Sequence, residues 1–568
     1  MTENSRTQPD RMESISVWKI WDNPIFRRYC QTRLRLRGLS IALLITSLLA
    51  GFLFFTTRAA SLIGQILACL MQSAAPSIPL LVLRGVHSLL LGTAQVSGGI
   101  TAEKDEGVID YQRLIPMTPL AKVLGYLFGL PIREYVMFCA TLPFTAWAIW
   151  KGQIAVAAWL PLYVVILISA LAYHLTALVT GTIAKNRRWA FLISIGLVFS
   201  LYTVVPLMSR FGFVFFKYLT IRPVLDEAMP GLLPRTAGAF VKVGQNLAPD
   251  VKFFNLNFPE AVFTIICQGV LIFIFIVMLW RKWQRHESLL LGKTWATGLF
   301  IWVQILLLGN ALPLIEPGTL FPSREMSSHM NIMNSWRPEP EEAVGMSSLY
   351  GVVTLAFLFI ILKIITPSFD IQVRGWRRAR KEGRSSLPLL SDAASAYGWV
   401  VVMSLAGAIG WYIFTQGLME SHWFPGHDLA WSVLVFYILV MLSSSLGLQT
   451  LLEAKGGRAV VLMIILIGVM PLMIGTVLSV SNNRLIPAAA WIAGASPISS
   501  PVYASAVLMS LSELPANLAR ALPRAFYFWQ AVFAITAVWL TFRLLIARKR
   551  IAESTVGGGA SASGSKDR

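Results

Sequence analysis

The residues best placed to act on another molecule form a charged cluster and a short amphipathic piece between two long apolar runs. They are Glu103, Lys104, Asp105, Glu106, Gly107, Asp110, Thr118 and Pro119. The first acids are predicted to open a short helix, where free backbone N–H groups favour negative charge. Gly107 permits a tight backbone, and the prolines end the element. Such a surface element is suited to receive a push from a soluble partner; the simpler alternative is a capped turn.

A second set of ionisable residues lies inside the apolar runs themselves. It consists of Arg84, His87, Arg133 and Glu134. Such groups are costly in lipid and usually face protein or water. Arg84 and His87 share a helix face, and we predict that Arg84 pairs with Glu134. The set could line a substrate path or lock two conformations together; alternatively it is structural, or its members reach to the membrane surface.

No residue pattern indicates catalysis, a cofactor or a metal site. The Gly-Lys-Thr at 292–294 lacks the glycine that a phosphate-binding loop requires five residues earlier, where Glu287 stands. His422, His427 and Asp428 share one short loop without a further ligand, which favours an ordinary surface loop. The four cysteines are scattered and suggest buried apolar residues. We expect a protein that is not itself an enzyme.

Composition places the chain in a membrane. Of its 568 residues, 56% are hydrophobic and 13% charged, against about 25% charged in soluble proteins. Several apolar runs reach the roughly 20 residues that a bilayer-crossing helix needs. We predict an all-α polytopic fold with about twelve transmembrane helices, at 38–57, 78–100, 121–147, 155–182, 189–209, 260–280, 295–315, 347–366, 397–418, 429–452, 459–480 and 527–547. A broken or re-entrant helix is predicted at 488–511, and 59–77 could extend a span.

The distribution of basic residues orients these spans. With the amino terminus inside, nearly all arginine and lysine clusters fall in inside loops, which follows the positive-inside rule. Both termini are then cytoplasmic. The net charge of +20 therefore reflects topology and does not indicate nucleic-acid binding. Residues 15–37, rich in aromatic and basic side chains, suit a helix lying in the membrane interface.

The two halves of the chain look alike. Residues 183–197 (IAKNRRWAFLISIGL) and 453–467 (EAKGGRAVVLMIILI) both begin an inside turn and enter a span. Six spans per half give a parallel repeat; chance similarity between apolar runs is the alternative. We predict a disordered start (1–14), a first half (15–280), a second half (281–547) and a flexible basic tail (548–568).

Two motifs resemble the permease subunits of type-2 ATP-binding-cassette (ABC) transporters. One is the acidic segment Glu103–Asp110 with Leu114, Thr118, Pro119, Leu120 and Gly125. The other, Asn23-Pro24-Ile25-Phe26-Arg27 followed by further arginines, resembles their amino-terminal elbow helix. The resemblance covers about 40 residues as motif and most of the chain as architecture.

The resemblance implies that Glu103 to Thr118 form a coupling helix that docks on a separate cytoplasmic ATPase subunit. It implies an elbow role for Pro24, Arg27, Arg28 and Arg33. ATP and Mg²⁺ would be bound by the partner, and the location would be a plasma membrane, the bacterial inner membrane. A second permease chain, identical or different, is a further implied partner. The second half departs from this pattern, because its loop 367–396 is basic.

The sequence thus predicts the membrane subunit of an ATP-driven exporter. The alternative is a twelve-helix secondary transporter driven by an ion gradient. A membrane enzyme acting on lipid would need a cluster of His, Asp or Glu near one interface, and the sequence shows none. Neither the substrate nor the direction of transport is indicated.

Overall fold

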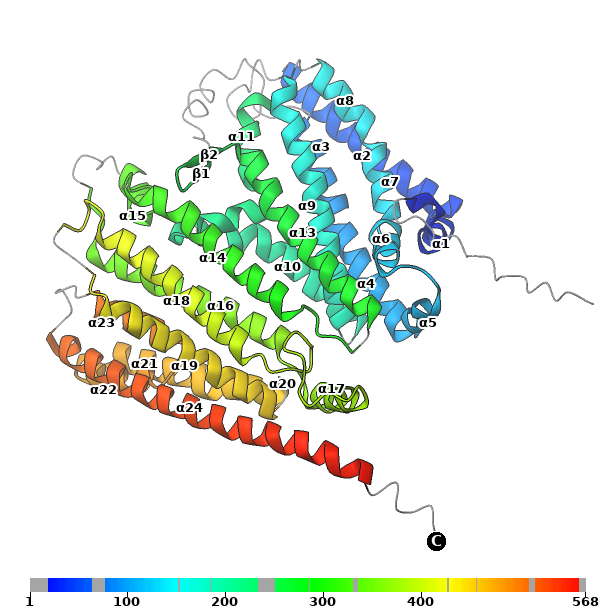
Figure 1. Ribbon diagram of the computed structural model, residues 1–568. Helices are drawn as coiled ribbons and strands as arrows, with labels where there is room; N and C mark the ends of the chain where they lie inside the picture. Colours follow the sequence, from blue (N-terminus) through cyan, green and yellow to red (C-terminus); the bar gives the residue numbers. More distant parts are fainter. Residues whose placement is uncertain are drawn as a thin grey trace, which may run out of the picture. The chain divides into compact units, whose positions relative to one another are not determined.

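Long apolar runs form long helices in the computed structural model of this chain (Figure 1). The structure describes residues 19–63, 77–151, 154–184, 186–232, 251–285, 287–329, 336–425, 429–455, 457–509 and 516–560. Eleven described helices are long and apolar enough to cross a membrane, and one bent pair could add a twelfth. The predicted all-α polytopic fold is confirmed. The predicted disordered residues 1–14 lie outside the described part.

The chain divides into two compact units. Unit 1 comprises 1–205, 218–249 and 259–286, and unit 2 comprises 206–217, 250–258 and 287–568. The helices of unit 1 are α1 (Pro24–Arg33), α2 (Leu36–Ile63), α3 (Ser77–Gly85), α4 (Gly92–Asp105), α5 (Val108–Leu114), α6 (Pro119–Gly129), α7 (Ile132–Ala140), α8 (Leu142–Lys151), α9 (Val156–Ile183), α10 (Arg187–Met208, which runs past residue 205), α11 (Arg222–Leu232) and α13 (Glu260–Gln284). A 3-10 turn, η1 (Ile20–Asp22), precedes α1, and the π-helical turn η2 (Val86–Leu91) joins α3 to α4.

Unit 2 begins with two short segments of the chain's first half, 206–217 and 250–258, and then holds the remaining helices. These are α14 (Lys293–Ile315), α15 (Pro322–His329), α16 (Pro340–Ile365), α17 (Phe369–Lys381), α18 (Tyr397–Met419), α19 (Ser432–Lys455), α20 (Gly457–Met463), α21 (Met470–Ser481), α22 (Ile486–Gly494), α23 (Ser500–Leu508) and α24 (Ala516–Ala560). A π-helical turn, η6 (Ile464–Val469), joins α20 to α21. Helices α18, α19 and α24 pack side by side (Figure 1).

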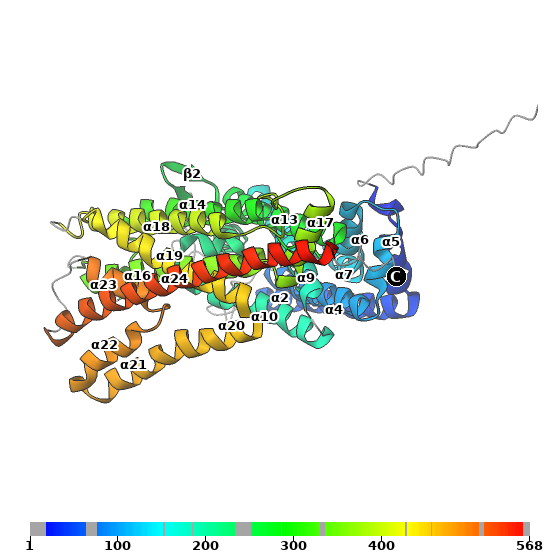
Figure 2. The same cartoon turned by 60° about the horizontal axis from the view of Figure 1, so that its bottom comes forward.

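Two apolar segments are interrupted for reasons visible in the sequence, one predicted as a continuous span and one predicted as broken. The span predicted at 121–147 bends by 47° between α6 and α7, where Gly129, Leu130 and Pro131 interrupt it. The segment predicted as broken at 488–511 forms α22 and α23, which Ser496-Pro497 separates. Figure 2 shows α22 folded back beside α21. Residues 64–76, most of the uncertain stretch at 59–77, lie outside the described part.

Two smaller elements were not predicted. The described residues between α10 and α13 form 3-10 turns and α11, and also an antiparallel hairpin of β1 (Val251–Phe253) and β2 (Leu256–Phe258). The amide of Phe254 donates to the carbonyl of Gly309 in α14 (2.8 Å). Helix α24 continues to Ala560, so residues 548–560 are helical where a flexible tail was predicted.

Each unit has a linker between its second and third spans. In unit 1 it is residues 106–118, containing α5; in unit 2 it is residues 366–396, containing α17. We call the end of each unit that carries this linker its linker end. The predicted coupling residues and the predicted elbow helix lie at the linker end of unit 1.

Candidate functional site

The linker of unit 1 begins with a reversal of the chain at Gly107. This glycine has φ +74°, a left-handed conformation that ends α4 and that other residues adopt with strain. Helix α5 follows at once. It buries Ile109 and Gln112 and exposes Asp110, Tyr111 and Leu114. An exposed leucine and tyrosine beside a carboxylate make a surface fitted for contact with another molecule.

The structure corrects the predicted placement of the first acids. Glu103, Lys104 and Asp105 are the last residues of α4, and they do not open a helix. The apolar run simply stays helical until Gly107 allows the reversal. Only Asp110 lies in the first turn of α5. The helix dipole therefore does not favour Glu103 and Asp105; Glu103 has side-chain partners instead, whereas Asp105 is exposed to solvent.

Glu103 is held by three side chains. One carboxylate oxygen accepts hydrogen bonds from Arg28 and from the Tyr29 hydroxyl, and the other accepts one from the Tyr126 hydroxyl. Its side chain is only 12% exposed. Burial and the Glu103 carboxylate both raise the pKa of Tyr29, so that hydroxyl stays protonated as a donor. We call Glu103, Arg28, Tyr29 and Tyr126 the Glu103 cluster; it joins α4 to α1 and α6.

Lys104 makes the second internal connection. Its ammonium donates to the carbonyls of Thr182 (2.9 Å) and Ala184 (3.0 Å), at the carboxyl end of α9. Carbonyls at a helix end lack intrahelical donors, and a lysine there satisfies them. Helices α4 and α9 are thereby fastened together at the linker end.

Asp105 and Glu106, by contrast, are exposed and form no ion pair among the residues that the structure describes. The sequence cluster therefore separates into two parts. Glu103 and Lys104 hold the unit together, whereas Asp105, Glu106, Asp110, Tyr111 and Leu114 face outward. We call these five the acidic surface.

The far end of α5 is fixed to α6 and α13. The Lys122 ammonium donates to the carbonyl of Arg113 (3.2 Å), and both cations lie 6.0 Å from the ring centre of Trp283. Tyr126 stacks on the same indole, with ring centres 5.3 Å apart. Arg113 also pairs with Asp110 within the helix. Trp283 ends α13, so a displacement of α5 would be transmitted to two further helices.

Helix α1, the predicted elbow, packs directly on α6. Asn23 caps it by accepting from the amides of Ile25 and Phe26, and its own amide group donates to the carbonyl of Ala121 (2.7 Å). Pro24 occupies the first helical position, where its missing N–H has no cost. A Cβ on Gly125 would stand 2.7 Å from Asn23 Oδ1, which explains the glycine there.

The other elbow arginines and the linker's last residues have local roles. Arg27 bonds the carbonyl of Trp21 (2.7 Å) and pairs with Asp22 (2.8 Å) at the surface. Arg33 donates to Gln95 of α4 (2.8 Å). Thr118 caps α6 by accepting a hydrogen bond from the amide of Ala121 (3.3 Å). Pro119 is the first residue of α6, whereas it was predicted to end the element that precedes this helix.

The predicted pairing of Arg84 with Glu134 is wrong. Arg84 is fully buried and donates instead to Thr141 Oγ1 (2.7 Å) and the Tyr163 hydroxyl (2.9 Å). The acceptors of Arg84 are thus two neutral hydroxyl oxygens, one just before α8 and one in α9, and not the carboxylate of Glu134. Glu134 is 2% exposed, with one carboxylate oxygen lacking a partner, and Arg133 is exposed at the start of α7. His87 contacts the carbonyl of Leu83 (2.8 Å) in the π-helical turn.

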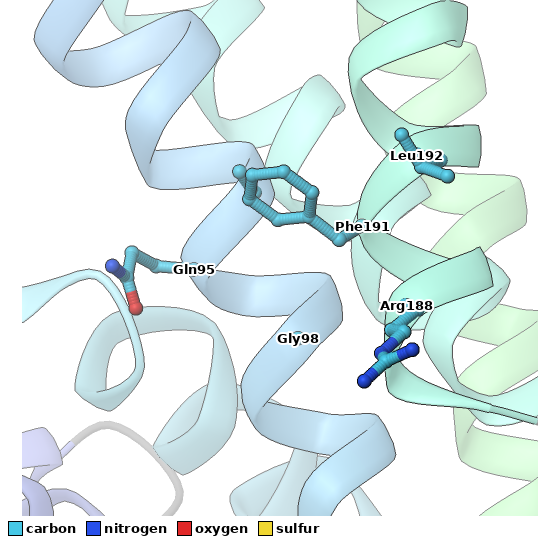
Figure 3. A pocket seen from close by; sticks show the side chains of 6 residues that line it. Gln95, Gly98, Arg188, Phe191 and Leu192 are labelled. Carbon is cyan, nitrogen blue, oxygen red and sulfur yellow. The ribbon is translucent and has the colours of Figure 1, made fainter.

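A cavity of about 410 Å³ lies between α4 and α10. It is lined by Ala94, Gln95, Gly98, Arg188, Phe191 and Leu192. Figure 3 shows Phe191 and Arg188 reaching from α10 toward α4, while the amide of Gln95 turns to the opposite side. Of the predicted intramembrane residues, none lines this cavity. A polar path through Arg84, His87, Arg133 and Glu134 therefore remains a prediction.

The linker end of unit 2 holds a buried network that the sequence analysis missed. Glu453 of α19, whose side chain is 2% exposed, accepts two hydrogen bonds from Arg548 of α24 and one from Gln449 (2.7 Å). Gln449 in turn accepts from Thr366, the residue that ends α16 (2.8 Å). We call Glu453, Arg548, Gln449 and Thr366 the Glu453 cluster. A signal was present: Glu453 stands where Ile183 stands in the aligned first half.

The remaining sequence motifs have structural roles. Lys293 of the Gly-Lys-Thr at 292–294 donates to the carbonyls of Ser391 (2.8 Å) and Ala394 (2.7 Å) and begins a span. His422 contacts Glu316 (2.6 Å), while His427 and Asp428 lie outside the described residues. Within the described part, no group of three or more His, Cys, Asp or Glu residues could hold a metal ion.

Comparisons with protein families, with curated proteins and with solved structures find no match to this chain.

Proposed function

We propose that this polytopic helical membrane protein is the membrane subunit of an ATP-driven transporter of the type-2 ABC class, an exporter with both termini in the cytoplasm. A separate cytoplasmic subunit would bind and hydrolyse ATP. The observation that carries the proposal is the division of the segment 103–118. Glu103 and Lys104 join four helices, α1, α4, α6 and α9, by hydrogen bonds, and the other part is the exposed acidic surface.

That division is what transmission of force requires. A partner bound to Asp105, Glu106, Asp110, Tyr111 and Leu114 would push on α5, which is too short to move alone. Trp283 and Lys122 connect α5 with α13 and α6, and the Glu103 cluster and Lys104 join α4, which leads into α5, to α1, α6 and α9. Because these contacts are hydrogen-bonded and packed, a displacement at the linker moves spans together.

The test is capture of an ATPase by the full chain. The chain, expressed with candidate ATP-binding-cassette subunits from its own organism, is purified in detergent and the retained ATPase quantified. We expect Glu106→Lys to lower retention about tenfold, since the partner that we propose would present basic residues to the acidic surface and a lysine there would repel them. Glu341→Lys, an exchange of the same kind at an acidic residue outside the linkers, is the matched control. Equal retention by both variants would contradict the proposal.

The buried Arg84 and Glu134 keep the secondary transporter as a second candidate, because ion-coupled carriers bury such groups. Substrate uptake into proteoliposomes distinguishes the two. Transport that needs ATP and the partner supports the first proposal. Transport by the purified chain alone, driven by a proton or sodium gradient and lost in Glu134→Gln, would replace it with the second.

A further inference from the structure

The linker of unit 2, residues 366–396, carries the opposite charge to that of unit 1. It contains six basic and three acidic residues. Its ends continue directly into α16 and α18, two membrane-capable helices. Both ends of the linker therefore lie at the same membrane surface, and the linker remains tethered there.

Part of its positive charge is already compensated. Arg374 and Arg378 both pair with Glu287 (3.2 Å for Arg378), and Arg384 pairs with Glu382 (3.3 Å). Arg377 and Lys381 are exposed, and among the described residues neither forms an ion pair. Arg380 lies over the Trp376 ring at 5.8 Å. The uncompensated cations thus belong to the last two turns of α17.

Large apolar side chains are exposed in the same linker. Phe369 is 58% exposed, Leu389 81% and Leu390 69%. The turn with the two leucines is fixed to the helix, since Ala393 and Leu387 contact α17 at Gly375. Helix α17 buries Gln372 and Ala379 on its other side. Phe369 and Arg380 are eleven residues apart and so share one face of the helix.

We propose that this surface binds the anionic phospholipids of the membrane leaflet in which the linker lies. The surface consists of Phe369, Arg377, Arg380, Lys381, Leu389 and Leu390. Exposed cations attract phosphate headgroups, and the exposed aromatic and aliphatic side chains of the same linker enter the headgroup boundary. A soluble protein partner is disfavoured, because it would have to compete with a lipid surface that the chain holds permanently within reach.

The proposal does not depend on an ATPase, so it is tested with the full chain alone. In a variant with its native cysteines replaced, Leu389→Cys carries a fluorophore, and the chain is placed in nanodiscs containing nitroxide-labelled lipid. We expect strong quenching in discs that contain phosphatidylglycerol and weak quenching in phosphatidylcholine alone. Exchanging Arg377, Arg380 and Lys381 together for glutamine should abolish the difference in quenching between the two lipid compositions. Each single exchange should weaken the association of the linker with phosphatidylglycerol about fivefold.

Two controls make the result decisive. Arg384→Gln removes a cation that already has a partner and should leave the quenching unchanged. Exchanging Arg377 and Arg380 for lysine keeps the charge and should also preserve it. Equal quenching in the two lipid compositions, with unfolding curves unaltered, would overturn the proposal. A second outcome would also overturn it. If the triple glutamine variant keeps its lipid quenching but loses a bound ATPase, the surface binds a protein and not lipid.

Discussion

The linker ends of the two units bury the same kind of group and expose opposite kinds. Each holds one glutamate fixed by an arginine: Glu103 by Arg28 in unit 1, and Glu453 by Arg548 in unit 2. Outside these clusters, unit 1 exposes the acidic surface and unit 2 exposes Arg377 and Lys381.

The two arginines come from different parts of their units. Arg28 belongs to α1, which precedes the first span, whereas Arg548 belongs to α24, the last span of unit 2. In the described residues 287–292, which precede α14, there is no helix corresponding to α1. The difference teaches that a buried carboxylate cluster is the common requirement for a firm linker end. The exposed charges are free to differ and so can select partners.

The largest effect is expected from Glu453→Gln. Arg548 would remain 16% exposed without its carboxylate, and removing one partner of a buried ion pair costs about 3 kcal/mol. Chemical unfolding in detergent micelles measures the change. Adding Arg548→Gln should restore much of the stability, because no buried charge is then unpaired. A double variant as unstable as the single one would show that the pair itself is not the stabilising feature.

Gly125→Ala should destabilise by about 2 kcal/mol, the cost of forcing extra atoms into a packed contact. The new methyl group would meet Asn23 Oδ1 at 2.7 Å and the Ile25 Cβ at 3.0 Å, and so displace α1 from α6. Gly298→Ala in α14 is the matched control, since nothing lies within 4 Å of its Cβ position. That variant should be neutral or slightly more stable. Equal behaviour of the two would show that α1 is not held by this contact.

Glu103→Gln should cost about 1 kcal/mol, less than Glu453→Gln. Arg28 is 36% exposed, so solvent screens the lost charge, and the amide oxygen still accepts from Tyr126. Arg27→Gln, which removes a fully surface pair with Asp22, is the control and should have almost no effect. If Glu103→Gln proves as costly as Glu453→Gln, the two clusters are energetically alike despite their different exposure.

Much of the fold could be predicted from the sequence, because a membrane-crossing helix needs only a long apolar run. The spans and the breaks at 488–511 follow from hydropathy and from prolines. The helical continuation of α24 past residue 548 was not predicted, and neither was the contact of Arg548 with Glu453. In the sequence, Arg548 looks like part of a charged tail, whereas in the structure it is hydrogen-bonded to the buried Glu453.

The candidate site was predicted as a segment but not as a geometry. The sequence marks 103–118 as unusual, yet it does not separate Glu103, which lies in the last turn of α4, from Glu106, which follows the end of that helix. That separation depends on Tyr29 and Tyr126, residues 74 and 23 positions away. Likewise, Arg84 and Glu134 are opposite charges in neighbouring spans, but Thr141 and Tyr163 happen to point at the guanidinium.

The smallest effects on stability, within about 0.5 kcal/mol, are expected from the exposed charges, since they lack partners in the fold. Glu106→Lys and Arg377→Gln should both unfold like the unaltered chain. Their effects on ATPase capture should nevertheless differ: the first variant loses the partner, and the second retains it, because only the acidic surface is proposed to dock. Retained ATPase, measured beside unfolding for each variant, checks this. Equal loss of capture in both variants would mean that the two linkers dock alike, and the contrast between the units would then not select partners.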